Sequence, residues 1–164
     1  MTLDTPFGAV DTTPDHEAFL AQRYRIEPIW YERAGVSWDF VVKQRIPTDA
    51  LAARELAVEA RRPARSEAGK GVRFARQAKA ASNDPVALIQ ELAPESTTYR
   101  DAGLPLKEIV FRILLAGGNQ PMSVQQLYDE VMAWVRGGDG RVITPEVLHR
   151  TLAADQDYGF LLVD

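Results

Sequence analysis

The chain has 164 residues, of which 46% are hydrophobic and 26% are charged, and its formal net charge is −4 at pH 7. This length and hydrophobic content are enough for one domain of ordinary size or two small modules, which excludes disorder along the whole chain. Cysteine is absent, which excludes disulfides, thiolate catalysis and cysteine-based zinc sites. The apolar runs are only a few residues long, whereas a bilayer span needs roughly 20.

The N-terminal stretch MTLDTPFGAVDTTPDHE lacks the basic and apolar regions of a secretory signal. Together with the missing cysteines and the short apolar runs, this predicts a soluble, cytoplasmic protein with no membrane partner.

Charge is distributed unevenly along the chain. Residues 1–20 carry four acidic residues and no Lys or Arg, and residues 138–164 carry two basic residues against five acidic ones. Residues 46–80, by contrast, carry eight basic residues against four acidic ones. A contact with a polyanion is therefore expected in the middle of the chain and not at its C-terminal end.

Residues 1–13 are interpreted as a flexible arm, and Thr13-Pro14-Asp15 is typical of a helix start, which predicts a short helix through Gln22. The following stretch YRIEPIWYERAGVSWDFVVKQR predicts an aromatic-rich β-hairpin with a turn at Ala34-Gly35. The residues that follow two-residue spacing are Tyr24, Ile26, Pro28 and Trp30 in the first strand and Val36, Trp38, Phe40 and Val42 in the second. Pro28 cannot donate a ladder hydrogen bond, which places the first strand at a sheet edge.

Three helices are predicted after the hairpin. The first begins at Thr48 or Asp49, ends before Pro63 and is expected to pack against the hairpin through an apolar stripe. That stripe consists of Leu51, Ala52, Leu56 and Ala60. The second carries Val72, Phe74, Ala75 and Ala78, and the third runs from Asp84-Pro85 through Leu92. Together with the hairpin they form a predicted region 14–93, and residues 94–103 are interpreted as a linker.

Residues 104–164 are interpreted as a C-terminal module of three helices and a terminal strand. LPLKEIVFRILLAGG places Leu106, Ile109, Val110, Ile113 and Leu114 on one helical face. SVQQLYDEVMAWVRGG opens with a capping box, Ser123 with Gln126, and buries Val124, Leu127, Val131 and Val135. TPEVLHRTL begins at Thr144-Pro145 and is expected to bury Val147, Leu148 and Leu152. YGFLLVD reads as a strand, so the predicted fold class is α+β.

The stretches LKEIVFRILLAGGNQPMSVQQLYDEV and ITPEVLHRTLAADQDYGFLLV resemble a winged helix-turn-helix module of the HARE-HTH and RNA polymerase delta N-terminal kind. The resemblance covers about 60 residues and implies a recognition helix over Thr144–Ala153, whose outer face would carry Glu146, His149, Arg150 and Thr151. It departs from the family because this helix has one Arg, acidic residues border it, and no second wing strand follows. The truncated wing is expected to pair with 141–143 or with the edge of the N-terminal hairpin. Such modules also serve as protein-docking surfaces.

The segment Arg61 to Lys79 holds seven basic residues against the single acid Glu67. The predicted nucleic-acid-binding residues are Arg61, Arg62, Arg65, Lys70, Arg73, Arg76 and Lys79, with His149 and Arg150 added by the resemblance. In this hypothesis they neutralise DNA or RNA phosphates without reading bases. The alternative is an ordinary solvated face, or one that pairs with acidic surfaces of the chain itself.

No catalytic constellation is found, so an enzyme is not predicted. Asp11, Asp15, His16 and Glu17 point in different directions at a helix start and fit helix capping better than metal binding. GKG at 69–71 lacks the spacing of a phosphate-binding loop, and Asp155 with Asp157 lacks the remainder of a calcium loop. No metal and no cofactor are therefore predicted.

The aromatic residues Trp30, Tyr31, Trp38 and Phe40 could stack on bases, but core packing or a buried dimer contact fits them better. The sequence favours a non-enzymatic nucleic-acid-associated regulator or accessory factor whose C-terminal module docks a protein partner. The alternative is a structural adaptor that contacts no nucleic acid, associating with a protein partner or with itself.

Overall fold

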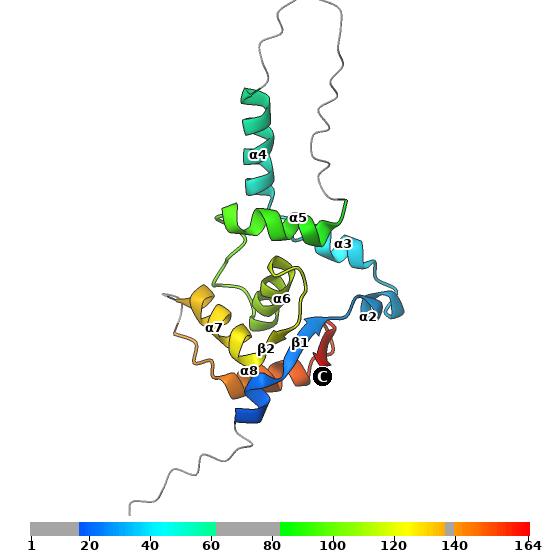
Figure 1. Ribbon diagram of the computed structural model, residues 1–164, viewed down its shortest axis with the longest axis vertical. Coiled ribbons are helices and arrows are strands. Elements are labelled where there is room, and N and C mark those ends of the chain that lie inside the picture. The colour runs from blue at the N-terminus through cyan, green and yellow to red at the C-terminus, as the bar shows by residue number, and fades with distance from the viewer. Residues whose placement is uncertain (1–16, 62–82, 137–139) are drawn as a thin grey trace, which may run out of the picture.

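The computed structural model describes residues 17–61, 83–136 and 140–164 (Figure 1). Its strands are β1 (Arg23–Ile26), β2 (Met122–Ser123) and β3 (Phe160–Val163). Its α-helices are α2 (Pro28–Arg33), α3 (Trp38–Lys43), α4 (Thr48–Ala60), α5 (Pro85–Leu92), α6 (Leu106–Ala116), α7 (Val124–Val135) and α8 (Pro145–Ala153). The 3-10 helices are η1 (Phe19–Ala21) and η2 (Ala93–Glu95). Helices around one small sheet confirm the predicted α+β class.

The sheet is antiparallel and has the strand order β2-β1-β3, with the N-terminal strand in the middle. Tyr24 of β1 lies opposite Met122 of β2 on one side and opposite Leu162 of β3 on the other. The terminal strand thus pairs with β1, the first strand of the predicted hairpin, which is one of the two pairings expected. The expected place of this strand at a sheet edge is wrong, because β1 has a neighbour on each side. The predicted regions 14–93 and 104–164 therefore share one sheet, as Figure 1 shows.

The predicted β-hairpin is wrong, because only its first residues form a strand. Pro28 is the first residue of α2, where its fixed φ favours a helix start, and the Glu27 side chain accepts a hydrogen bond from the Ile29 N–H. The second predicted strand is α3, which Ser37 caps by accepting from the Phe40 N–H at 3.3 Å.

The spacing of buried residues in α3 explains this correction. Val42 is fully buried, and Trp38 and Val41 pack on the core, so the inward positions are i, i+3 and i+4 as in a helix. Phe40, at 60% exposed, points outward, although the strand pattern grouped it with Trp38 and Val42. The core interpretation of the aromatic residues holds for Tyr31, which is 5% exposed, but not for Phe40.

The helices of the C-terminal part follow the sequence prediction closely. α6 lies at the centre of the molecule (Figure 1), and its residues Ile109, Val110 and Leu114 are fully buried. The capping box of Ser123 with Gln126 begins α7 as predicted. Val147 of α8, expected inside, is 40% exposed. None of the described helices is long and apolar enough to cross a membrane.

α4 has the predicted extent but not the predicted packing. It projects from the rest of the described molecule (Figure 1), and its apolar residues Leu56 and Val58 are 72% and 65% exposed. Arg54, in the middle of α4, joins this helix to α5 and η2 through ion pairs with Glu91 at 3.1 Å and Glu95 at 3.0 Å. Hydrophobic burial therefore contributes little along the outer half of this helix.

Candidate functional site

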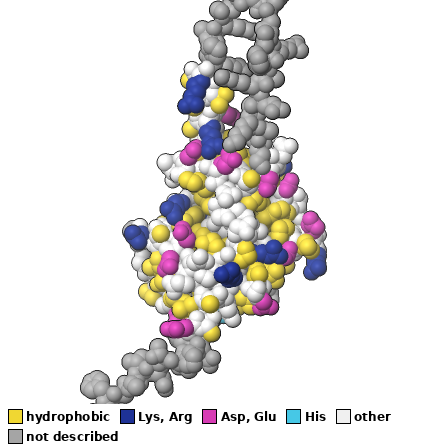
Figure 2. All heavy atoms as spheres, in the orientation of Figure 1, with side chains coloured by type: hydrophobic (Ala, Val, Ile, Leu, Met, Phe, Trp, Pro, Cys, Tyr) yellow, Lys and Arg dark blue, Asp and Glu magenta, His cyan; other side chains and the backbone are white. Residues whose placement is uncertain are grey.

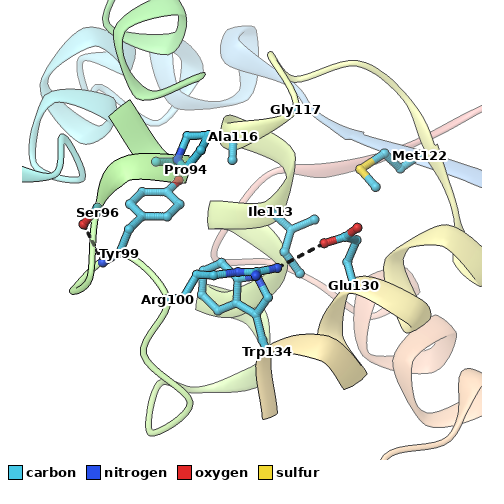
Figure 3. A pocket seen from close by; sticks show the side chains of 11 residues that line it. Pro94, Ser96, Tyr99, Arg100, Ile113, Ala116, Gly117, Met122, Glu130 and Trp134 are labelled. Carbon is cyan, nitrogen blue, oxygen red and sulfur yellow. Dashed lines mark hydrogen bonds and ion pairs between the residues drawn. The ribbon is translucent and has the colours of Figure 1, made fainter. Parts of the chain in front are cut away.

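A groove with a volume of about 500 Å³ opens between the segment 93–100 and helices α6 and α7. Figure 3 shows Ile113 of α6 at its centre, with Tyr99 and Pro94 on one side and Met122 and Glu130 on the other. Its lining residues are Ala93, Pro94, Ser96, Tyr99, Arg100, Ile113, Ala116, Gly117, Met122, Glu130 and Trp134. A cavity of this size accommodates a small ligand or one to two side chains of a partner.

Hydrogen bonds to α4 hold the segment that forms one wall of the groove. The Ser96 hydroxyl donates to the Asp49 carboxylate at 2.7 Å, and the Thr97 N–H donates to the other oxygen of that carboxylate at 2.9 Å. These bonds hold the pKa of Asp49 well below its usual range. Ser96 also accepts from the Tyr99 N–H at 3.0 Å, which forms the turn that directs Tyr99 inward.

Tyr99 and Trp134 form the aromatic part of the groove. Their rings meet edge to face with centroids 6.0 Å apart, and they are only 2% and 8% exposed. The Tyr99 hydroxyl donates to the Arg112 carbonyl at 2.8 Å, and burial raises the pKa of this phenol. Both rings belong to the hydrophobic core, so only a small part of each ring is open to the groove, where their fixed orientations form a rigid wall.

An ion pair lies at the mouth of the groove. Arg100 donates to Glu130 at 3.4 Å, and its guanidinium carbon lies 5.6 Å above the Trp134 ring (Figure 3). Both charged side chains are about half exposed, at 54% and 49%. Exposed ion pairs of this kind contribute about 0–1 kcal/mol, so either partner can exchange the other for a ligand group at small cost.

Glu108 of α6 is a buried carboxylate, at 8% exposed. It accepts two hydrogen bonds from Arg45, both at 2.9 Å, and one from Arg112 at 3.0 Å. Burial alone would raise the pKa of Glu108, but the hydrogen bonds from the two arginines outweigh it and lower the pKa. Because arginines occupy both carboxylate oxygens, this group joins the residues after α3 to α6 and is not placed to act as an acid or base.

Among the described residues, no group of three or more His, Cys, Asp or Glu side chains is placed to hold a metal ion. The groove itself offers aromatic carbon, the Met122 thioether and the one ion pair. These groups bind apolar side chains well because a thioether and aromatic rings adapt to varied shapes.

The structure does not bring the predicted nucleic-acid residues together. Of those it describes, Arg61 ends α4, whereas His149 and Arg150 lie on α8 at the opposite end of the molecule (Figure 1). Arg62, Arg65, Lys70, Arg73, Arg76 and Lys79, together with the predicted helix that carries Val72, Phe74, Ala75 and Ala78, lie outside the described residues. Arg61 is exposed at the C-terminal end of α4, and Arg150 is exposed on α8. Over the face drawn in Figure 2, positive and negative side chains are interspersed, and neither sign forms a continuous patch.

The expected outward orientation of His149 is wrong. Its Nδ1 lies 3.2 Å from the Tyr24 hydroxyl, and its ring centroid lies 5.4 Å from that of Phe19. The side chain therefore joins α8 to the N-terminal strand. Thr151, also expected outside, is half-buried, and its hydroxyl donates to the Val147 carbonyl of the same helix at 2.7 Å. Of the four expected outer residues, Arg150 is the one that is clearly exposed.

The sequence did not predict the groove, because Tyr99 and Arg100 lie in the stretch interpreted as a linker. Trp134 was not among the residues assigned to the buried face of its helix. A large aromatic residue inside an apparent linker was the available signal, since such residues are usually buried. Comparisons of this chain with protein-family models, with curated proteins and with solved structures find no match.

Proposed function

We propose that this protein is a non-enzymatic accessory factor that binds a partner protein by holding an apolar or aromatic side chain of that partner in the groove. The observation that carries the proposal is the composition of the groove: Tyr99, Trp134 and Met122 line it, and Arg100 stands at its mouth. Aromatic residues, Met and Arg are the types enriched at protein interfaces, and buried aromatic anchors carry most of their binding energy.

The ion pair of Arg100 with Glu130 at the mouth can fix the orientation of the bound partner segment. A partner backbone carbonyl or carboxylate can replace Glu130 as the acceptor for Arg100, since the existing ion pair is exposed. The partner's apolar side chain would then lie over Ile113 and between Met122 and the aromatic pair (Figure 3). The preferred ligand is thus a short peptide segment with one large apolar residue next to an acceptor.

Gly117 allows the groove to be blocked without disturbing the core. It ends α6 with a φ of −85°, and an added Cβ would lie 3.5 Å from the Ile113 carbonyl oxygen and 3.9 Å from the Met122 sulfur. Those are ordinary contact distances, so Gly117→Leu should fold and place its side chain at the wall of the groove. Ala133→Leu makes a comparable change at an exposed position of α7 that does not line the groove.

The test is a selection of random displayed peptides on the full-length chain, followed by titration of the enriched peptides. We expect them to share an apolar or aromatic anchor, to change the fluorescence of the protein's tryptophans, and to bind Ala133→Leu like the unmodified chain. Binding to Gly117→Leu should be at least roughly tenfold weaker, about 1.4 kcal/mol. Equal binding to Gly117→Leu, or no enrichment, would contradict the proposal.

The second candidate function is association with nucleic acid by a winged-helix-like module. The three helices α6, α7 and α8 followed by the strand β3 support this candidate. Phosphate contacts would come from Arg61, Arg150 and the basic residues of 62–79. The inward position of His149 leaves α8 with few polar groups for base contacts, so the contacts would be nonspecific.

Fluorescence anisotropy of labelled duplex and single-stranded DNA, measured over a salt series, tests this second candidate. Phosphate contacts predict binding that weakens steeply with salt and is lost when Arg73→Glu and Arg76→Glu are combined. Absence of binding at low salt, or unchanged affinity of the double variant, would leave protein docking as the function.

A further inference from the structure

The N-terminal segment (residues 1–16) has the composition that the groove requires of a ligand. This segment lies outside the described residues, and its sequence is MTLDTPFGAVDTTPDH. It contains Phe7 as its only Phe, Tyr or Trp, three aspartates, and no Lys or Arg. In the proposed function, the groove takes one large apolar side chain next to an acceptor for Arg100. The chain itself therefore carries a ligand of this kind.

The neighbours of Phe7 favour insertion of its ring into a groove. Pro6 has a fixed φ and restricts the residue before it to extended conformations, so the segment loses less conformational freedom when it binds. Gly8 has no side chain that could hold the Phe7 ring away from the groove. A groove of about 500 Å³ accommodates one aromatic side chain, and Met122 offers it an adaptable thioether.

Arg100 can bind a carboxylate of the N-terminal segment while it keeps its bond to Glu130. Its Nη2 donates to Glu130 at 3.4 Å, and within the described part of the chain its Nε and Nη1 donate to no other group. A guanidinium has several N–H donors on different edges, so it can hold two carboxylates at once. Asp4, three residues before Phe7, supplies the second carboxylate. The segment brings no cation that would compete with Arg100.

The N-terminal segment joins the described chain close enough to the groove to reach it. η1 packs against α7, and the Val124 N–H at the start of α7 donates to the Gln22 carbonyl at 2.9 Å. The same helix supplies Trp134 to the groove. α7 has 12 residues, so its length plus one helix diameter is about 28 Å. Phe7 precedes Glu17 by ten residues, which span up to about 33 Å when extended.

We propose that residues 4–8 dock in the groove of their own molecule, with Phe7 as the anchor and Asp4 as an acceptor for Arg100. This inference rests on the proposed function, because it takes the groove as a peptide-binding site. A short tether gives an effective concentration on the order of 1 mM, so a contact with a dissociation constant of about 0.1 mM keeps the groove about nine-tenths occupied. The segment then competes with partner proteins, and a partner must displace it in order to bind.

The first test is fluorescence anisotropy of a labelled synthetic peptide of residues 1–16, titrated with the full-length chain. Phe7→Ala in the chain should raise its affinity for this peptide about tenfold, because the groove no longer holds its own segment. Leu3→Ala is the matched control, since it shortens an apolar side chain of the same segment outside residues 4–8, and it should leave the affinity unchanged. Gly117→Leu combined with Phe7→Ala should weaken binding of the peptide at least tenfold, which places the peptide in the groove.

Trp134 reports occupancy of the groove without an added peptide. The chain has three tryptophans, and Trp134→Phe identifies the NMR signal of the Trp134 indole N–H. Phe7→Ala should shift this signal in the full-length chain, and the position of the signal should not depend on protein concentration. A signal that moves with concentration would place the segment of a second copy in the groove and would overturn docking within one molecule.

The outcomes distinguish this inference from the proposed function. An unchanged Trp134 signal and unchanged peptide affinity in Phe7→Ala would overturn the docking, whereas displayed peptides that still require an open Gly117 position would keep the groove as a partner site. If neither the labelled peptide nor any displayed peptide binds the Phe7→Ala chain, both proposals are wrong. Tighter binding of the labelled peptide that Gly117→Leu does not weaken would place it outside the groove and also overturn the docking.

Discussion

The side-chain amide of Asn119 acts as a strand partner for Ile26. Its oxygen accepts from the Ile26 N–H at 2.9 Å, and its nitrogen donates to the Ile26 carbonyl at 2.9 Å. β2 ends opposite Tyr24, two residues short of this position, so Asn119 extends that edge of the ladder. The residue has a φ of 56°, a left-handed conformation that Asn tolerates better than most residues.

Replacement of Asn119 should therefore be costly. Asn119→Gly keeps the backbone conformation but leaves the N–H and carbonyl of fully buried Ile26 without partners, and we expect a loss of about 2 kcal/mol in the free energy of unfolding. Asn119→Ala should lose about 1 kcal/mol more, because alanine is strained at positive φ. Urea unfolding of both variants measures this. Equal stability of the two variants would show that the positive φ of residue 119 does not strain alanine.

Neutralisation of Glu108 should destabilise the fold because Arg45 and Arg112 would remain partly buried without their counter-charge. We expect Glu108→Gln to lower the free energy of unfolding by roughly 3 kcal/mol at pH 7. Glu130→Gln, which makes the same change at the exposed ion pair with Arg100, should cost less than about 1 kcal/mol. Urea unfolding at low ionic strength compares the two, and a similar small loss in both would contradict the structural role of Glu108.

The same carboxylate predicts a pH dependence. The pKa of Glu108 is lower in the folded chain than its ordinary value, so its ionisation stabilises the fold above about pH 4.3, and this contribution is lost as pH falls through the folded pKa. The stability difference between the unmodified chain and Glu108→Gln should therefore shrink from pH 7 toward pH 3. Asp49 and Asp155 also have lowered pKa values and titrate in both chains, so they cancel in the difference.

Asp155 controls the beginning of β3. Its carboxylate is almost fully buried, pairs with Lys107 at 3.0 Å and accepts from the N–H groups of Tyr158 and Phe160. We expect Asp155→Ala to cost about 3 kcal/mol, because these donors lose a charged acceptor. Exchange of the amides of Tyr158 and Phe160 should accelerate most. Asp157→Ala, which removes an exposed partner of Lys107, is the control and should change stability little.

Arg54→Ala should loosen α4 without unfolding the rest of the molecule. Arg54 joins this helix to Glu91 and Glu95, and the apolar residues of its outer half are exposed. We expect faster amide exchange along α4, the same effect in the unmodified chain at high salt, and an unchanged midpoint of global unfolding. A lower global midpoint would mean that α4 belongs to the cooperative core.

The sequence predicted most helices well because their ends carry strong local signals. Thr144, Ser123 and Asp84 each cap a helix with the side chain, as expected from their position before Pro or an apolar run. The hairpin prediction failed because the run from Val36 to Val42 fits both a two-residue and a helical spacing. Only tertiary contacts show that Trp38, Val41 and Val42 face the core while Phe40 does not.

The candidate groove could not be derived in the same way. Its walls come from several segments between residues 93 and 134, and the positions of Tyr99 and Trp134 depend on how α6 and α7 pack. Local patterns identify an amphipathic helix but not which residues of two helices and a turn converge. The pairing of β3 with β1 was open in the sequence for the same reason, since a strand of four apolar residues does not specify its partner.

The central position of β1 has a consequence for how the chain acquires its fold. β1 lies between β2 and β3, yet about 100 residues or more separate it from either in the sequence. β3 can join the sheet only after synthesis has passed Phe160–Val163. Until then, the backbone groups of β1 that face β3 have no strand partner. Folding limited by such distant contacts is slow compared with helix formation. A fragment that starts at Leu104 would have β2 and β3 with no strand to join them, and we expect it to remain without a stable sheet.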